Sequence, residues 1–145
     1  MKFLMVIGIL LTIGGLLTAA GGLSAVSYVG HAKVAAALAR GGTLVTASDL
    51  VVLGSHRTGP GQVELHEKET DVFYVMDGDA TFVTGGSMVT GKVTSPGQVR
   101  SSDMRGGQIH HLSKGDVIVI PAGTPHWFKE VPQAISYDVV KVLKE

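Results

Sequence analysis

The sequence predicts an all-β domain of the sandwich or jelly-roll barrel class, preceded by a short helix and an apolar N-terminal segment. Glycine is abundant, with 20 residues in 145, whereas aromatic residues make up only 6%. From residue 43 onward, short runs of β-branched and aromatic residues alternate with turn-forming residues, and helical periodicity is absent. The length suits a single domain, because domains usually span about 100–200 residues.

The first 27 residues differ in composition from the rest. After Lys2 no charged residue occurs until Lys33, and the most apolar part ends near Leu17 in small residues. This pattern is typical of a secretory signal peptide. Candidate cleavage sites follow Ala20, Ala25 or Ser27. The alternative is an uncleaved membrane anchor, because the stretch is long enough to span ~30 Å of hydrocarbon. In both cases we expect an exported protein, periplasmic or secreted, that meets a membrane only if this segment is uncleaved.

A short helical lead-in is predicted over residues 28–42. Alanine and leucine in HAKVAAALARGG favour a helix, Arg40 suits its last turn, and Gly41 or Gly42 can end it. The β domain then takes residues 43–145. Its candidate strands are residues 43–46, 50–53, 62–66, 72–76, 80–84, 108–112, 117–120, 126–130 and 135–143.

Turn signals separate these strands, among them Asp77-Gly78-Asp79 and Lys114-Gly115-Asp116. Residues 84–107 form a Gly- and Ser-rich insertion without clear period. The favoured interpretation is a solvated loop, since nothing in it is chemically special. A lid over the barrel mouth and an extra hairpin near residues 88–93 are the alternatives.

Charge and cysteine content exclude several functions. Twelve basic residues balance twelve acidic ones, and no basic run occurs, so neither nucleic acid nor an anionic surface is an expected partner. Because the chain contains no cysteine, it has no disulfide, no thiolate metal site and no cysteine nucleophile.

The stretch GDVIVIPAGTPH, residues 115–126, places a histidine on a rigid frame. Its β-branched run reads as a buried strand, and the corner that follows is tight because Pro121 and Pro125 fix φ while Gly123 can take a positive φ. His126 is therefore held in one place, either packed for structural reasons or serving as a ligand.

Partners for His126 lie in the segment ELHEKETD. Glu64 and His66 are two residues apart on a candidate strand, so they share a face, and Asp71 begins the next strand after a short turn. Two imidazoles with one or two carboxylates are a typical site for a divalent transition metal. The alternative is a solvated charged turn next to an ordinary barrel-wall histidine.

At these residues the sequence resembles the cupin superfamily. The second cupin signature, G-x5-P-x-G-x2-H-x3-N, is matched by Gly115, Pro121, Gly123 and His126, with Glu130 in place of the asparagine. The resemblance covers about residues 43–143. It implies a jelly-roll barrel, the double-stranded β-helix, and small single-domain cupins suggest a homodimer.

The first cupin signature, G-x5-H-x-H-x3,4-E-x6-G, is degenerate. Glu64 stands at the first histidine, His66 at the second, Asp71 at the glutamate, and Gly78 closes the motif. Carried over by position, the resemblance implies Glu64, His66, Asp71 and His126 as metal ligands. This set is rich in oxygen, which suits Mn, Fe(II), Zn or Ni better than a soft-ligand metal.

The expected function is that of an exported cupin that binds a divalent metal and acts on or binds a small molecule. The resemblance allows dioxygenase-, isomerase- or lyase-type chemistry, with Glu64 as the general base if it is not a ligand. The alternative is a non-catalytic module, metal-free in one version, that binds a small ligand. His110, Trp127 and Tyr74 are further candidates for contact with the substrate, and packing is the competing interpretation of each.

Overall fold

The computed structural model describes residues 22–144. The predicted signal peptide or anchor, residues 1–27, lies mostly outside this range and stays a prediction. No helix within residues 22–144 is long and apolar enough to cross a membrane.

The predicted helix is present as α1, His31–Arg40. It ends where expected, because Gly41 takes a φ of 79° and its N–H donates to the carbonyl oxygen of Ala37 at 2.7 Å. Ala37 is buried against Gly54, where a Cβ atom would lie 2.7 Å from the Ala37 Cβ. The missing side chain at Gly54 therefore allows the helix to pack closely on the sheet.

The rest of the described chain is built from strands. They are β1 Gly42–Thr46, β2 Leu50–Arg57, β3 Val63–His66, β4 Glu69–Thr84, β5 Ser87–Val89, β6 Lys92–Ser95, β7 Gln98–Ser101, β8 Asp103–Arg105, β9 Gln108–Ser113, β10 Val117–Ile120, β11 His126–Glu130 and β12 Ile135–Leu143.

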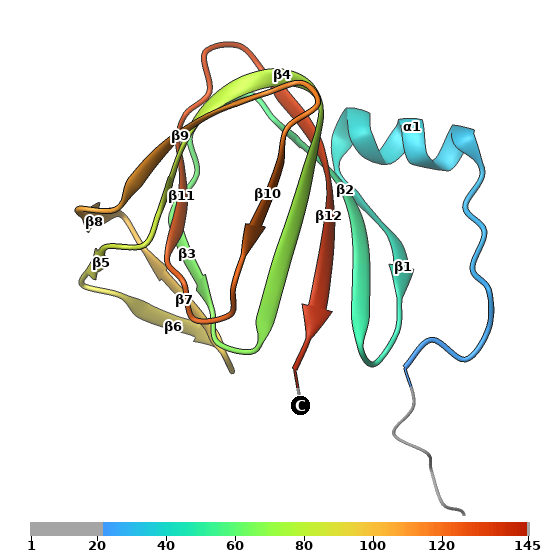
Figure 1. The fold of residues 1–145 in the computed structure, drawn as a ribbon, viewed down its shortest axis with the longest axis horizontal. Coiled ribbons are helices and arrows are strands. Elements are labelled where there is room, and N and C mark those ends of the chain that lie inside the picture. Colours follow the sequence, from blue (N-terminus) through green and yellow to red (C-terminus); the bar gives the residue numbers. More distant parts are fainter. Residues whose placement is uncertain (1–21, 145) are drawn as a thin grey trace, which may run out of the picture.

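The strands pair antiparallel and curl into a jelly-roll barrel (Figure 1). Their order is β1-β2-β12-β4-β11-β3-β7-β6, with β9 and β10 also paired to β4, while β5 and β8 form a separate two-stranded sheet. The helix α1 lies against β2 and β1 at one side (Figure 1). The predicted all-β jelly-roll class is confirmed.

One long strand replaces the two expected over residues 72–84. The turn predicted at Asp77-Gly78-Asp79 was wrong, because β4 continues through it and bends instead. Gly78 has a φ of 81°, and a Cβ there would collide with the carbonyl oxygen of Ala134. Before the bend β4 pairs with β10 and β12, and after it with β9 and β11, so this strand belongs to both walls of the barrel.

The solvated loop expected over residues 84–107 was also wrong, and the hairpin alternative is nearer to the structure. β5 pairs with β8, and β6 pairs with β7, so the β6–β7 hairpin lies within the connection between β5 and β8. β7 in turn pairs with β3, placing Arg100 opposite Glu64 and Gln98 opposite His66. The backbone of β3 thus imposes the strand conformation on a segment whose polar side chains gave no periodic signal.

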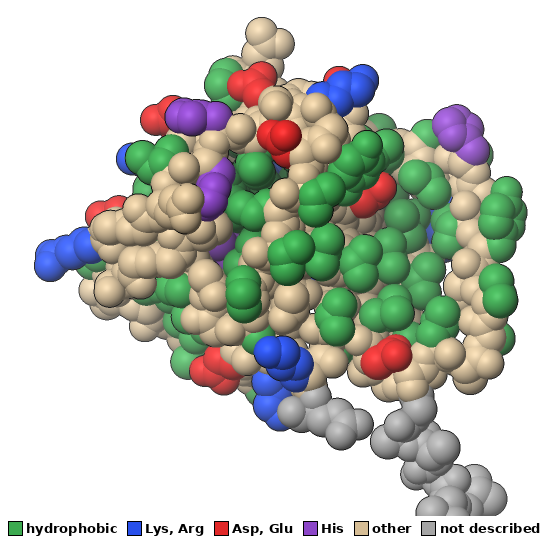
Figure 2. Space-filling view, viewed as in Figure 1, with side chains coloured by type: hydrophobic (Ala, Val, Ile, Leu, Met, Phe, Trp, Pro, Cys, Tyr) green, Lys and Arg blue, Asp and Glu red, His purple; other side chains and the backbone are tan. Residues whose placement is uncertain are grey.

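The core fills the barrel with aromatic rings. The ring centroids of Phe82 and Phe128 lie 4.6 Å apart. Tyr137 lies 5.0 Å from both Phe73 and Phe128. Alternate residues of the strands face outward, so hydrophobic side chains also appear on the surface over β10 and β4 (Figure 2).

Candidate metal centre

Strand pairing brings Glu64 and His126 face to face. The two residues are direct partners in the β3–β11 ladder, and directly opposite residues of an antiparallel pair lie on one face with Cβ atoms about 4.5–5.5 Å apart. His66, two residues after Glu64, shares that face. Glu64, His66 and His126 each offer a ligand atom, and these atoms lie within 4.8 Å of one another.

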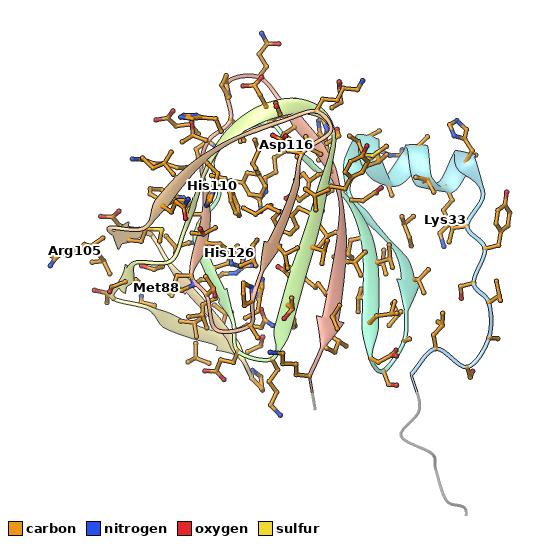
Figure 3. The ribbon with its side chains drawn as sticks, in the orientation of Figure 1. Lys33, Met88, Arg105, His110, Asp116 and His126 are labelled. Atoms are coloured by element: carbon orange, nitrogen blue, oxygen red, sulfur yellow. The ribbon has the colours of Figure 1, made fainter. Side chains whose placement is uncertain are left out.

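The corner before His126 is as tight as the sequence predicted. Gly123 has a φ of 79°, and its N–H donates to the carbonyl oxygen of His66 at 2.7 Å. On the other side, the N–H of Gly85 donates to the carbonyl oxygen of Pro125 at 2.8 Å. The turn is therefore fastened to the backbone of the strand that carries the other histidine, and His126 points into the barrel (Figure 3).

Hydrogen bonds at Nδ1 define which nitrogen of each histidine is free to bind a metal. The Nδ1 of His126 lies 3.1 Å from the carbonyl oxygen of Thr124, which only accepts, so Nδ1 carries the proton. The Nδ1 of His66 bonds to Oε1 of Gln98, whose Nε2 donates to Glu69 at 2.7 Å. Gln98 thus presents its oxygen to His66, which again assigns the proton to Nδ1. In this tautomer Nε2 is the nitrogen that each ring offers to a metal.

The two Nε2 atoms converge on Asp71. Its Oδ2 lies 3.4 Å from Nε2 of His66 and 3.8 Å from Nε2 of His126. The shorter aspartate side chain therefore reaches both imidazoles, although it replaces the glutamate of the cupin signature. His66 belongs to both groups of converging ligand atoms in the described residues, one with Glu64 and His126 and the other with Glu69 and Asp71. Imidazole nitrogens with carboxylate oxygens form a donor set that fits a divalent transition metal.

A buried ion-pair network stands behind Asp71. The Nζ of Lys141 donates to Oδ1 and Oδ2 of Asp71 at 2.9 and 3.2 Å and to Oε2 of Glu69 at 2.7 Å. Burial would raise the pKa of Glu69, but its hydrogen bond and charge interaction with Lys141 outweigh this and lower it. Burial would likewise lower the pKa of Lys141, but its bonds to Glu69 and Asp71 raise it. Glu69 and Lys141 are therefore both charged at neutral pH.

His126 lies in the most apolar part of the site. Its ring centroid is 6.0 Å from that of Phe82 and 6.4 Å from that of Phe73. Burial lowers the pKa of His126, an effect that the hydrogen bond to Thr124 opposes. The ring consequently stays neutral over most of the physiological range, as a metal ligand must.

A pocket of ≈ 320 Å³ opens beside the cluster. Its polar lining comes from β2, β3, β4, β7 and β12, and it includes the charged residues Arg57, Glu64, Glu69, Asp71, Arg100 and Lys141. Arg100 pairs with Glu64 at 3.0 Å. Burial raises the pKa of Tyr137 at the pocket wall, although Arg57 opposes the shift, so the hydroxyl stays protonated.

The sequence reasoning missed Glu69, Gln98, Lys141 and Arg57. Lys141 carried a readable signal, because it follows Tyr137 and Val139 at the spacing of one strand face. A lysine on the same strand face as buried residues is expected to pair with an acidic residue inside the barrel. Gln98 carried no such signal, since its segment did not read as a strand.

The remaining predicted residues lie outside the pocket lining. His110 bonds through Nε2 to the Thr84 hydroxyl at 2.8 Å, and Trp127 donates from its indole N–H to the carbonyl oxygen of Gly61 at 2.8 Å. Tyr74 is 45% exposed on the outer face of β4. None of His110, Trp127 and Tyr74 is among the described residues that line the pocket.

Fold and cluster together define a double-stranded β-helix barrel with a histidine and carboxylate site inside. The cupin family model matches residues 47–141, which is well over half of the chain. The protein therefore belongs to the cupin family. No curated protein matches its sequence.

Solved structures agree with this fold. The DMSP lyase DddQ of Ruegeria pomeroyi DSS-3 is 15% identical with a TM-score of 0.50, covering 71% of this chain and 46% of the lyase. A Klebsiella pneumoniae protein with a double-stranded β-helix domain is 17% identical with a TM-score of 0.50, covering 71% of this chain and 70% of its own. A Bacillus halodurans protein is 16% identical with a TM-score of 0.52, and the match covers 71% of this chain and 69% of that protein. The chain thus spans less than half of the lyase, and at these identities the likeness concerns the fold.

Proposed function

We propose that this cupin binds a divalent transition metal through His66, His126 and Asp71, with Glu64 beside them, and takes a small molecule into the adjoining pocket. The observation that carries the proposal is the convergence of the Nε2 atoms of His66 and His126 on one Asp71 oxygen, at 3.4 and 3.8 Å. A divalent cation between these atoms would bind all three as ligands. Lys141 pairs with Asp71 and Glu69, and none of its hydrogen bonds within the described residues goes to an imidazole.

A bound ion would supply Lewis acidity toward a carbonyl or hydroxyl oxygen, or a redox centre if the metal is Fe or Mn. Around it, the protein holds three anionic and three cationic side chains in the pocket wall. Glu64 is the residue free to exchange a proton with a ligand, because its only described ion pair is to Arg100, which is 51% exposed. These features favour lyase-, isomerase- or dioxygenase-type chemistry on a small polar molecule.

A second candidate function is a metal-free binding module. Its specific support is Lys141, which already gives Asp71 and Glu69 a counter-charge. In that case the pocket binds its ligand through hydrogen bonds and ion pairs, without an ion at the histidines.

The test is metal content measured by elemental mass spectrometry on untagged protein after incubation with Mn, Fe(II), Ni or Zn. We expect near-stoichiometric metal in the wild type and its loss in His66→Ala and His126→Ala. The matched control is His111→Ala, since His111 lies on β9 outside the pocket lining. A folded wild type that takes up none of the four ions would exclude the metal centre and favour the binding module.

Export and self-association belong to the same proposal and rest on the sequence. We propose a protein delivered across the cytoplasmic membrane by residues 1–27 and active as a homodimer. The mass of the N-terminal peptide from the isolated protein tests cleavage after Ala20, Ala25 or Ser27, and sedimentation velocity tests the dimer. An intact N-terminus in a membrane fraction would favour the anchor.

A further inference from the structure

Arg57 differs from the other cations of the pocket in its charge partners. Lys141 pairs with Glu69 and Asp71, and Arg100 pairs with Glu64. No carboxylate among residues 22–144 forms an ion pair with Arg57, although the guanidinium is partly buried. A partly buried cation without a counter-charge lowers the stability of the fold, and an anionic ligand bound beside it would offset this penalty.

The guanidinium of Arg57 is nevertheless held in place. Its Nε donates to the hydroxyl of Tyr137 at 2.9 Å, and its central carbon lies 4.8 Å from the centre of the Phe128 ring. A side chain at Gly61 would come within 2.7 Å of Nη1, so the missing Cβ makes room for the fork. The bond to Tyr137 uses Nε and leaves the two Nη groups for another acceptor.

Arg57 also lies at a junction. Besides the pocket at the histidines, a second hollow of ≈ 470 Å³ lies between β2 and the glycines that follow α1. Arg57, Ser55, Leu53 and Tyr137 line both. Arg57 is therefore within reach of a ligand in either hollow.

We propose that Arg57, positioned by Tyr137, anchors the carboxylate of a small aliphatic acid whose other end lies at His66 and His126. The planar guanidinium fork matches a carboxylate in geometry, and such charge-assisted bonds are about twice as strong as neutral ones. The pocket of ≈ 320 Å³ lies at the small end of the range for small-molecule sites, which suits a small acid. This assignment of the ligand class rests on the proposed function, because the histidine cluster defines the reacting end.

The test is calorimetric titration of the purified protein with propionate, malonate and succinate, with malonamide as the uncharged analogue and inorganic phosphate as the competing anion. We expect one of the acids to bind and malonamide not to bind. Arg57→Gln should weaken the binding roughly tenfold or more, the range for a hydrogen bond to a charged group. The matched control, Arg105→Gln, removes an exposed arginine from the far end of β8 (Figure 3) and should leave the affinity unchanged.

Arg57→Lys is a second variant that separates loss of the anchor from a folding defect. It keeps the positive charge of Arg57 but lacks the planar guanidinium. An affinity between those of the wild type and Arg57→Gln supports the anchor. Equal affinity in the wild type and Arg57→Gln, no binding of any acid, or tighter binding of phosphate than of every acid would each overturn it.

Metal content, measured on the same samples with and without added ion, separates the two proposals. Acid binding that depends on Arg57 in a protein unable to hold metal would keep the anchor and remove the metal centre. Full metal content together with acid binding that is unchanged in Arg57→Gln would keep the metal centre and remove the anchor.

Discussion

Lys141 donates to both carboxylate oxygens of Asp71, at 2.9 and 3.2 Å, while the same carboxylate faces two histidine nitrogens on its other side. Asp71 is only 2% exposed, so its charge depends on these neighbours rather than on water. One aspartate therefore joins the ion-pair network to the candidate metal centre.

Replacing Lys141 by methionine should destabilise the metal-free protein by about 3 kcal/mol, because removing one partner of a buried pair leaves the other charge uncompensated. Urea unfolding of Lys141→Met against wild type measures this. The matched control is Lys114→Met, which removes an exposed lysine whose pair with Asp77 is 3.7 Å long. If Asp71 is a ligand, saturating Zn²⁺ should recover more stability in Lys141→Met than in the wild type. An equal gain in both proteins would contradict a role for Asp71 in binding the metal.

Asp71 and Glu64 should differ in their contribution to metal affinity. Asp71 lies within 3.8 Å of both Nε2 atoms, whereas Glu64 is tied to Arg100. Asp71→Asn should weaken metal binding by about 10–100-fold or more, since loss of a residue that only hydrogen-bonds to a ligand already has an effect of that size. Glu64→Gln should change metal affinity less and lower turnover or ligand affinity more. Competition with a chelator of known affinity measures both, and the opposite order would make Glu64 the ligand and Asp71 the partner of Lys141 alone.

Outer-sphere support for His66 gives a third prediction. Gln98 fixes the ring through its amide oxygen and is itself held by Glu69 at 2.7 Å. Gln98→Leu keeps the volume but removes the acceptor for Nδ1, so it should weaken metal binding about 10-fold or more while His66 remains. Gln98→Glu keeps an acceptor but loses the N–H that holds Glu69 and places two carboxylates side by side, so it should restore the affinity only in part. A Gln98→Leu protein with wild-type affinity would show that His66 needs no such support.

The strands that the sequence predicted best are those with strong local signals. β10, β11 and β12 have the predicted bounds, because β-branched runs there end at proline, glycine or charged turns. The histidine and carboxylate cluster was also predictable, since a period of two and a fixed corner determine where those side chains point.

The rest depends on tertiary pairing that local sequence does not encode. Asp77-Gly78-Asp79 has the composition of a turn, yet pairing with β12 keeps it within a bent strand. Gln98 and Arg100 reach the site only because β3 recruits β7 as its neighbour. Asp71 accepts a hydrogen bond from Lys141, which lies seventy residues away in the chain, and no local pattern predicts which residue Lys141 meets.

The bend in β4 should be intolerant of a side chain. At Gly78, alanine would combine a left-handed φ with a collision against the Ala134 carbonyl oxygen, so we expect Gly78→Ala to cost about 2 kcal/mol or more. At Gly59 nothing lies within 4 Å of an added Cβ, and Gly59→Ala should stay within about 0.5 kcal/mol of wild type. Equal effects of the two substitutions in urea unfolding would mean that the bend relaxes.

Asp138 gives a prediction about pH. It lies on β12 between Gly54 and Tyr74, and its Oδ1 is buried without a hydrogen-bond partner in the described part of the protein. Burial raises the pKa of Asp138 above its ordinary 3.8. The folded protein thus binds this proton more tightly than the unfolded chain does, so the contribution of Asp138 to the free energy of unfolding falls as pH rises from about 3.8 through the folded pKa.

Asp138→Asn removes that titration and should be more stable than wild type at pH 7, because no charge is then buried. The gain should shrink as pH falls through the folded pKa toward 3.8, and below about 3.8 the wild-type carboxyl is protonated in both states. Urea unfolding at several pH values between 3.5 and 7, with Asp77→Asn as the control at an exposed carboxylate, measures the difference. A gain that stays constant with pH would mean that the amide stabilises through new hydrogen bonds, and a loss at pH 7 would mean that Asp138 has a partner in solution.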